Sequence, residues 1–159
     1  MPCAPAQAPT LAGFTAFLYN VAGFPVGALP GTSPVIEMAF CVALEIVNLQ
    51  LAYVSPLIYQ LAVYNLGTSN VLNYAQDPVP ATVKLNDLPY FQALRAQFNC
   101  LGFTAGVISS TADESTSESL LTPEFMKGLT LSNLQQLKDP WGRQYLAFAQ
   151  DMGTLWGVT

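Results

Sequence analysis

The sequence predicts a mainly α protein: a small helical bundle with a Ser/Thr-rich hairpin or loop insertion and extended arms at both ends. Its 159 residues are enough for one domain with its own core. Apolar residues recur at spacings of three and four, the period of an amphipathic helix. A capping residue also precedes proline four times, and such pairs mark helix starts. These pairs are Ser33-Pro34, Ser55-Pro56, Thr122-Pro123 and Asp139-Pro140.

The first half of the chain is predicted to hold three helices after an irregular arm at 1–8. The first ten residues carry three prolines and lack the basic segment that begins a signal peptide. A turn rich in Gly and Pro separates the first helix from the second. The third helix contains Gly67, which allows a close helix crossing. The predicted helices are 9–20, 34–48 and 56–74.

The second half begins with a connector at 77–89 that holds three prolines, followed by a fourth helix at 89–101. Residues 102–120 lose the helical period and are rich in Ser and Thr, which predicts a hairpin or loop with its turn near Ala112-Asp113. Shorter helices are predicted at 123–128, 130–138 and 140–151. An apolar tail at 153–159 ends the sequence.

Helix 34–48 is apolar over most of its circumference. Its polar positions fall on one narrow line along the helix. They are Glu37, Glu45 and Asn48, with Cys41 between them. A helix of this kind is expected to be buried on more than one side.

The apolar stretch at 38–64 raises the question of a membrane span. A span needs about 20 consecutive apolar residues. Glu45, Asn48 and Gln50 interrupt the stretch, and Ser55-Pro56 breaks it. No Lys or Arg flanks either end, so the positive anchor of a membrane helix is missing. The sequence therefore predicts two buried helices.

The composition predicts a surface that is mostly covered. Hydrophobic residues make up 52% of the chain and charged residues only 9%, against roughly 25% charged in an average soluble domain. A free monomer needs surface charge to stay apart from other surfaces, so a membrane or protein neighbours are expected to cover this one. The net charge of −5 and the scattered basic residues argue against binding nucleic acid by phosphate neutralisation.

The sequence predicts no enzyme, no catalytic residue, no cofactor and no metal site. Histidine is absent, a GxSxG motif is absent, and the cysteines are few and far apart. Cys41 and Cys100 are expected to be buried free thiols in a protein that folds in a reducing cytosol. Glu45 is expected to have a structural role, either paired across an interface or at a wet seam.

Three stretches resemble the head-to-tail connector (adaptor or head completion) proteins of tailed bacteriophages. They are LIYQLAVYNLG (57–67), ISSTADESTSES (108–119) and LKDPWGRQYLAFAQ (137–150). In that family a Ser-rich hairpin precedes a helix that opens as T/D-P-Y/W-G-x-x-Y. The matching positions here are Asp139, Pro140, Trp141, Gly142 and Tyr145. The resemblance covers about 30–152 and leaves out the two arms.

The resemblance implies a structural virion protein that forms a ring, usually of twelve copies, beneath the portal. The ring joins head to tail and continues the DNA channel. The implied partners are further copies of the chain, the portal protein, a tail or nozzle/stopper protein, and double-stranded DNA that passes without sequence-specific binding; no membrane is involved. The implied location is the neck of the virion, after assembly in the cytoplasm of the bacterial host.

The resemblance also assigns roles to residues. A ring needs a contact between unlike faces of one subunit, and helix 34–48 would supply it. The expected subunit interface is Phe40, Ala43, Glu45 and Ile46. The expected portal or tail docking residues are Leu155, Trp156 and Val158, although packing of Trp156 on its own chain stays open. The expected channel-facing or partner-facing residues are Asp113, Glu114 and Glu118; twelve copies at −5 would give the ring about −60.

Other functions stay open. A tail terminator or tail completion protein is a near neighbour of the connector hypothesis. A small membrane-associated protein could use residues 38–66, and a helical domain that binds a small molecule could line a pocket with its apolar surplus. A discrete ring without detergent favours the connector, a detergent requirement favours the membrane protein, and a stable monomer favours the small-molecule binder.

Overall fold

The computed structural model describes residues 8–100, 110–113, 116–119 and 131–152. The mainly α fold is confirmed. The helices are α1 (Leu11–Asn20), α2 (Pro34–Ile46), α3 (Gln50–Val54), α4 (Pro56–Tyr74), α5 (Tyr90–Gln97), α7 (Leu131–Gln136) and α8 (Pro140–Met152). The strands are β1 (Lys84–Leu85), β2 (Leu88–Pro89), β3 (Ser110–Asp113) and β4 (Thr116–Ser119), paired as two antiparallel hairpins.

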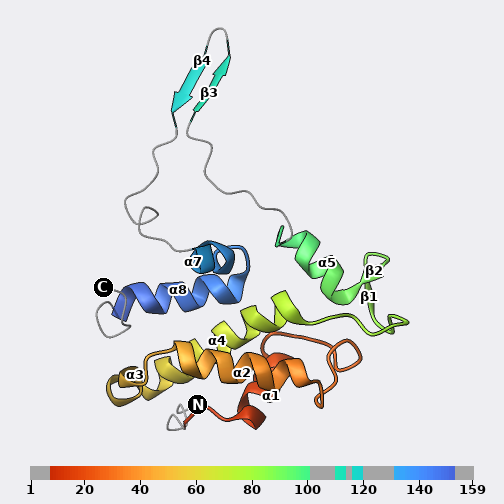
Figure 1. Cartoon of the computed structure of the whole chain (residues 1–159), viewed down its shortest axis with the longest axis vertical. Coiled ribbons are helices and arrows are strands. Elements are labelled where there is room, and N and C mark those ends of the chain that lie inside the picture. Colours follow the sequence, from red (N-terminus) through yellow and green to blue (C-terminus); the bar gives the residue numbers. More distant parts are fainter. Residues whose placement is uncertain (1–7, 101–109, 114–115, 120–130, 153–159) are drawn as a thin grey trace.

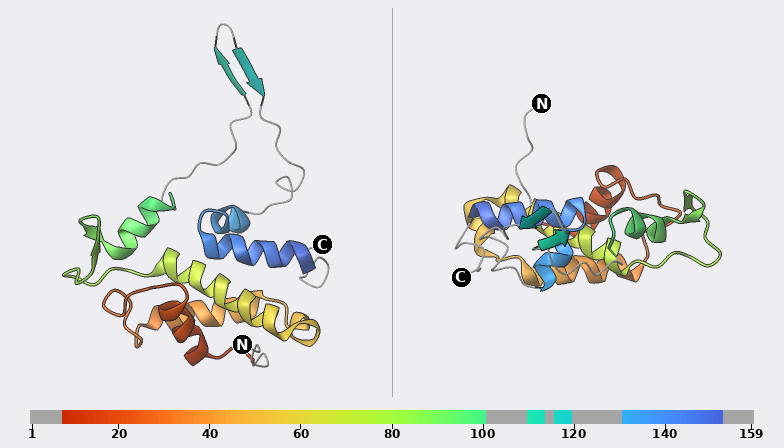
Figure 2. Two further views of the ribbon diagram at one scale, coloured as in Figure 1. Left: turned by 180° about the vertical axis from the view of Figure 1, so that it is seen from behind. Right: turned by 90° about the horizontal axis from the view of Figure 1, so that it is seen from above.

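Helix α4 is the centre of the helical body. α2 packs along one side of it and α8 along another (Figure 1). α1 contacts both α2 and α4 and lies behind α2 in the view of Figure 1, as Figure 2 shows. Every residue from 62 to 69 is buried. Buried polar side chains in this stretch have hydrogen-bond partners: the Thr68 hydroxyl donates to the Tyr64 carbonyl at 2.7 Å, and the Ser69 hydroxyl donates to the Asp139 carboxylate at 2.7 Å. The centre of α4 can therefore be enclosed by neighbours without leaving these groups unpaired.

The predicted close crossing at Gly67 is confirmed. A Cβ atom at Gly67 would lie 2.8 Å from Cζ of Phe14 on α1, closer than side chains normally approach. Gly13 of α1 similarly abuts the hydroxyl of Tyr64. That hydroxyl accepts the Thr10 N–H at 3.2 Å. Glycine on each helix thus brings α1 and α4 into close contact.

The proline pairs place the helix starts correctly, but not always by the expected bond. α2 and α4 begin at Pro34 and Pro56 as predicted, yet neither preceding serine makes a side-chain cap bond. Asp139 does accept the Gly142 N–H at 2.7 Å. Proline itself therefore marks two of these starts through its fixed φ. Thr122-Pro123 and the helix predicted at 123–128 lie outside the described residues.

Helices α2 and α5 are shorter than predicted. α2 ends at Ile46, and the short helix α3 follows after the Asn48 side chain accepts the Gln50 N–H at 2.9 Å. The predicted connector contains the small hairpin β1–β2, whose turn residues Asn86 and Asp87 have φ of 51° and 64°. Two adjacent residues with positive φ are typical of a type I′ hairpin turn.

The Ser/Thr-rich segment contains a hairpin. β3 and β4 pair antiparallel, with Asp113 opposite Thr116. Strand β3 ends at Asp113, next to the position near Ala112-Asp113 where the turn was predicted. Figure 1 draws this hairpin apart from the helices.

Two further expectations concern exposure. Among the described residues, no helix combines the length and hydropathy that a membrane crossing requires. Cys100 is buried as predicted, but the prediction for Cys41 is wrong, because Cys41 is exposed on α2. It lies on the polar line of that helix, and the neighbouring helices cover the other side.

Candidate interaction surface

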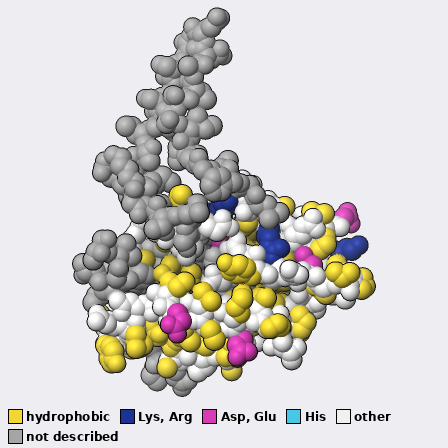
Figure 3. Space-filling model, viewed as in Figure 1, with side chains coloured by type: hydrophobic (Ala, Val, Ile, Leu, Met, Phe, Trp, Pro, Cys, Tyr) yellow, Lys and Arg dark blue, Asp and Glu magenta, His cyan; other side chains and the backbone are white. Residues whose placement is uncertain are grey.

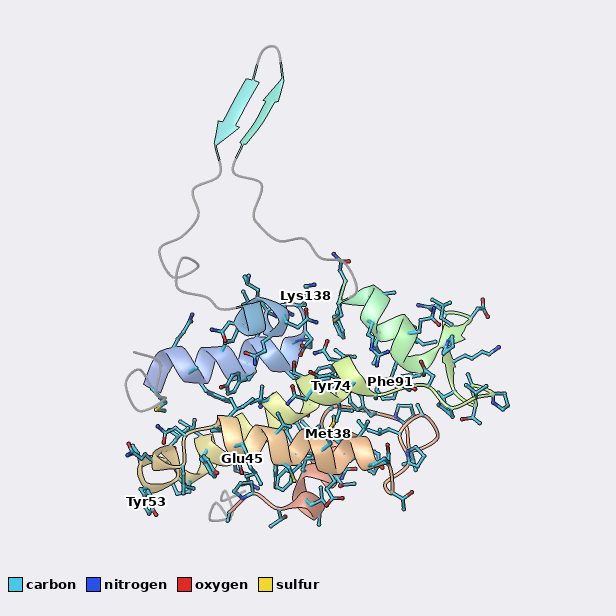
Figure 4. The ribbon with its side chains drawn as sticks, in the orientation of Figure 1. Met38, Glu45, Tyr53, Tyr74, Phe91 and Lys138 are labelled. Carbon is cyan, nitrogen blue, oxygen red and sulfur yellow. The ribbon has the colours of Figure 1, made fainter. Side chains whose placement is uncertain are left out.

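The outer face of α2 and α3 is an exposed apolar surface, which we call the α2–α3 patch. On α2 the exposed apolar residues lie four apart, so they form one stripe along the helix. The patch continues through Leu49, which is 59% exposed, to α3, where Tyr53 is 83% exposed. Figure 4 shows Met38 on α2 and Tyr53 on α3. The patch comprises Met38, Val42, Ile46, Leu49, Tyr53 and Val54.

The charged groups next to this patch have one sign. Glu37 and Glu45 of α2 are both exposed, and Lys84 is the first lysine or arginine of the chain. Figure 3 shows hydrophobic and acidic side chains over α2 and α3, whereas the basic side chains visible in this view lie away from these two helices. Within the part of the chain that the structure describes, the patch is therefore apolar, weakly acidic and free of cations.

The predicted subunit-interface residues fall on two different faces of α2. Phe40 and Ala43 are buried against the chain's own helices, with 0% of Ala43 exposed. They are therefore not available to meet a partner in this fold, which corrects their assignment. Glu45 and Ile46 are exposed, so the face they share with Met38 and Val42 is the one that a partner can reach.

A second, concave surface lies between α1 and α4, and we call it the α1–α4 groove. It is a shallow hollow, open to solvent, with a volume of about 330 Å³. Tyr64 holds its shape, because the Tyr64 hydroxyl bonds to Thr10 at the start of α1 and accepts the Gln60 amide N–H at 3.2 Å. The lining residues are all uncharged: Gly13, Ala16, Phe17, Asn20, Val21, Gln60, Leu61 and Tyr64.

The Asp-Pro-Trp-Gly sequence at the start of α8 binds α8 to the rest of the body. The buried Asp139 carboxylate accepts the Ser69 hydroxyl of α4 and the Gly142 N–H, each at 2.7 Å. Burial raises the pKa of Asp139, while these two hydrogen bonds and Arg143 oppose the rise. Gly142 abuts the backbone of Gln136, so a side chain there would clash.

Trp141 completes this junction. Its indole ring makes edge contacts with Phe24, at a centroid distance of 5.4 Å, and with Phe98, at 6.1 Å. Tyr145, one turn further along α8, is also buried. The motif that carries the family resemblance is therefore part of the internal packing of this chain.

Charged side chains at the same junction cap helix ends. Arg95 of α5 donates to the carbonyls of Leu72 and Ala75 at the end of α4. Burial lowers the pKa of Arg95, and Asp77 opposes this. The Asp77 carboxylate in turn accepts two backbone N–H groups of α5, from Phe91 at 2.8 Å and from the following residue at 3.0 Å. The charged side chains of Arg95 and Asp77 therefore stabilise helix ends within the subunit.

The remaining predicted site residues stay predictions. Leu155, Trp156, Val158 and Glu114 lie outside the described residues. Asp113 and Glu118 lie on β3 and β4, near the turn of the hairpin. In the described part of the chain, no group of three or more His, Cys, Asp or Glu side chains is arranged to hold a metal ion.

Comparison with known proteins found no family model, no curated protein and no solved structure that matches this chain.

Proposed function

We propose that this protein is a structural subunit that assembles with copies of itself into a ring. Following the resemblance in its sequence, the ring is that of a head-to-tail connector, which lies beneath the portal of a tailed bacteriophage and continues the DNA channel towards the tail. The protein has no catalytic role in this proposal. Its partners are its own copies, the portal and a tail component.

The observation that carries the proposal is the α2–α3 patch. Six large apolar side chains form it, and each is at least two-fifths exposed. Fully burying one such side chain is worth about 1.5–3 kcal/mol, so leaving all of them in water is unfavourable. Contiguous exposed apolar patches of this kind mark protein or membrane contacts. Following the resemblance in the sequence, the proposal takes a protein as the contact.

The placement of the cations supports passage of DNA without tight binding. Arg95 is held by backbone carbonyls, and Lys138 donates to the Cys100 carbonyl at 3.5 Å. With five basic residues in all and a net charge of −5, the chain lacks a cluster of Lys and Arg that would grip phosphates. A channel of such subunits would let DNA slide past.

The test is the mass of the full chain purified without detergent. Native mass spectrometry and analytical ultracentrifugation are expected to find one discrete oligomer, and electron microscopy is expected to show rings. Portal protein is then added to the oligomer, and co-sedimentation is expected. A chain that stays at 17.1 kDa at high concentration, with and without portal, would rule out the proposal. Binding to tail components but not to portal would favour a tail completion protein.

A further inference from the structure

The acidic residues beside the α2–α3 patch disfavour a contact between the patches of two copies. A two-fold contact brings the same surface of both copies together. Glu37 and Glu45 are exposed beside the apolar stripe, so such a contact would bring four carboxylates together with no cation between them. Like charges placed together across an interface oppose association. A second copy must therefore offer a different surface to the patch.

The α1–α4 groove has the complementary properties. The patch ends in the protruding side chain of Tyr53, whereas the groove is hollow and has an uncharged lining. Its lining includes the amides of Asn20 and Gln60, which can donate hydrogen bonds to a carboxylate such as that of Glu45. The groove therefore carries no charge that would repel the carboxylates beside the patch, and its largely apolar lining suits the uncharged side chain of Tyr53.

The two surfaces also face in different directions. α2 lies on the side of the body seen in Figure 1, and α1 lies on the opposite side, as the two views of Figure 2 show. A contact that joins opposite, unlike faces repeats from copy to copy. Such a contact closes into a ring if the rotation per copy allows it.

We propose that the α2–α3 patch of one copy docks into the α1–α4 groove of the next copy, with Tyr53 as the side chain that enters the groove. This inference rests on the proposed function, because it names the contact by which the ring forms. It differs from the expected interface, which included the buried residues Phe40 and Ala43.

The experiment uses two full-length variants that each damage one surface. Tyr53→Glu places a charge on the patch, and Ala16→Glu places one in the groove. Both positions are exposed in the subunit, so both variants are expected to keep the wild-type circular dichroism spectrum. Each alone is expected to be a monomer, because an unpaired charge in the contact weakens association by about 100-fold. Val21→Glu, at the exposed end of α1, serves as a second groove variant.

The decisive step is to mix the two variants in equal amounts. One intact patch and one intact groove remain in each mixed pair. Native mass spectrometry should therefore find a heterodimer of about twice 17.1 kDa, with no larger ring and no homodimer. The control substitutions, Ala147→Glu on α8 and Val79→Glu, lie at exposed positions outside both surfaces and should leave the wild-type oligomer unchanged.

The outcomes separate this inference from the proposed function. If the wild type forms rings but the mixed variants give no heterodimer, the docking contact is wrong and the ring proposal stands. Rings formed by Ala16→Glu and Val21→Glu would also overturn the contact, because they would show that the groove is not used. A wild type that remains monomeric overturns both.

Discussion

The α2–α3 patch and the junction where the start of α8 meets α4 and α5 reverse the usual distribution of polar and apolar groups. At the junction the interior is polar: Asp139 and Ser69 are fully buried, and Arg95 is held among backbone carbonyls. At the patch the exterior is apolar, and Tyr53 is 83% exposed. Several of the few charges of this chain are thus used inside the fold as helix caps. The free surface is therefore even poorer in charge than the composition suggests.

The largest effects are expected at two adjacent residues of α2, one buried in the subunit and one on the α2–α3 patch. Ala43 is 0% exposed and Val42 is 42% exposed. Ala43→Glu buries an unpaired carboxylate and should lower the free energy of unfolding by about 4 kcal/mol or more. Val42→Glu should leave that free energy within about 0.5 kcal/mol of the wild-type subunit but prevent assembly. Urea unfolding and native mass spectrometry measure the two effects.

A folded Ala43→Glu variant that still assembles would show that α2 does not present the face described here. Equally, an unfolded Val42→Glu variant would mean that the patch belongs to the core of the subunit. The pair therefore separates a surface that holds the subunit together from one that joins subunits.

The next largest effect is expected at the junction. Gly142→Ala places a methyl group against the backbone of Gln136, which cannot move aside as a flexible side chain could. We expect a loss of about 3 kcal/mol in the free energy of unfolding. Gln144→Ala, at an exposed position of the same helix, should change it by less than about 0.5 kcal/mol. An unfolding curve for Gly142→Ala that matches this control would contradict the close packing of α7 against α8.

The sequence predicts the bounds of α4 fully, but it predicts the region of α2 and α3 only in part. The span of α4, from Pro56 to Tyr74, is predicted in full because Ser55-Pro56 marks its start and its apolar period is long. The division between α2 and α3 and the hairpin β1–β2 were missed. Asn86-Asp87 is a local signal for that hairpin, since these residue types tolerate positive φ.

The buried side of α2 follows the helical period in the sequence, because Ile36, Ala39, Phe40, Ala43 and Val47 form one apolar stripe and all are buried. The exposure of a second apolar face could not be predicted, because α2 is apolar nearly all round. The structure packs the small residues Ala39 and Ala43 inwards and leaves Met38, Val42 and Ile46 outside. Small residues four apart would have been a usable signal, since they let helices approach closely. The cap that Asp77 provides to α5, from 14 positions before Phe91, depends on tertiary structure and leaves no local pattern.

A smaller effect is expected when the Asp139 side chain is changed. Asp139→Ala removes the cap on Gly142 and leaves the buried Ser69 hydroxyl without its acceptor. The free energy of unfolding should fall by about 2 kcal/mol. Asp139→Asn should retain most of the stability, because an amide oxygen can accept the Gly142 N–H and the amide nitrogen can donate to Ser69. Equal losses in the two variants would show that these hydrogen bonds do not hold the junction.

The pH dependence of stability gives the finest test of the same region. Burial raises the pKa of Asp139 in the folded state, against the opposing effects of Gly142, Ser69 and Arg143. Folding therefore favours the protonated carboxyl. The stability that this group contributes is fully present below the ordinary aspartate pKa of about 3.9, and it is lost as the pH rises through the higher folded value. The difference in free energy of unfolding between wild type and Asp139→Asn, measured by urea unfolding at a series of pH values, should therefore shift against the wild type as the pH rises through this range. A difference that does not change with pH, or that shifts towards the wild type, would mean that hydrogen bonding at the junction outweighs burial.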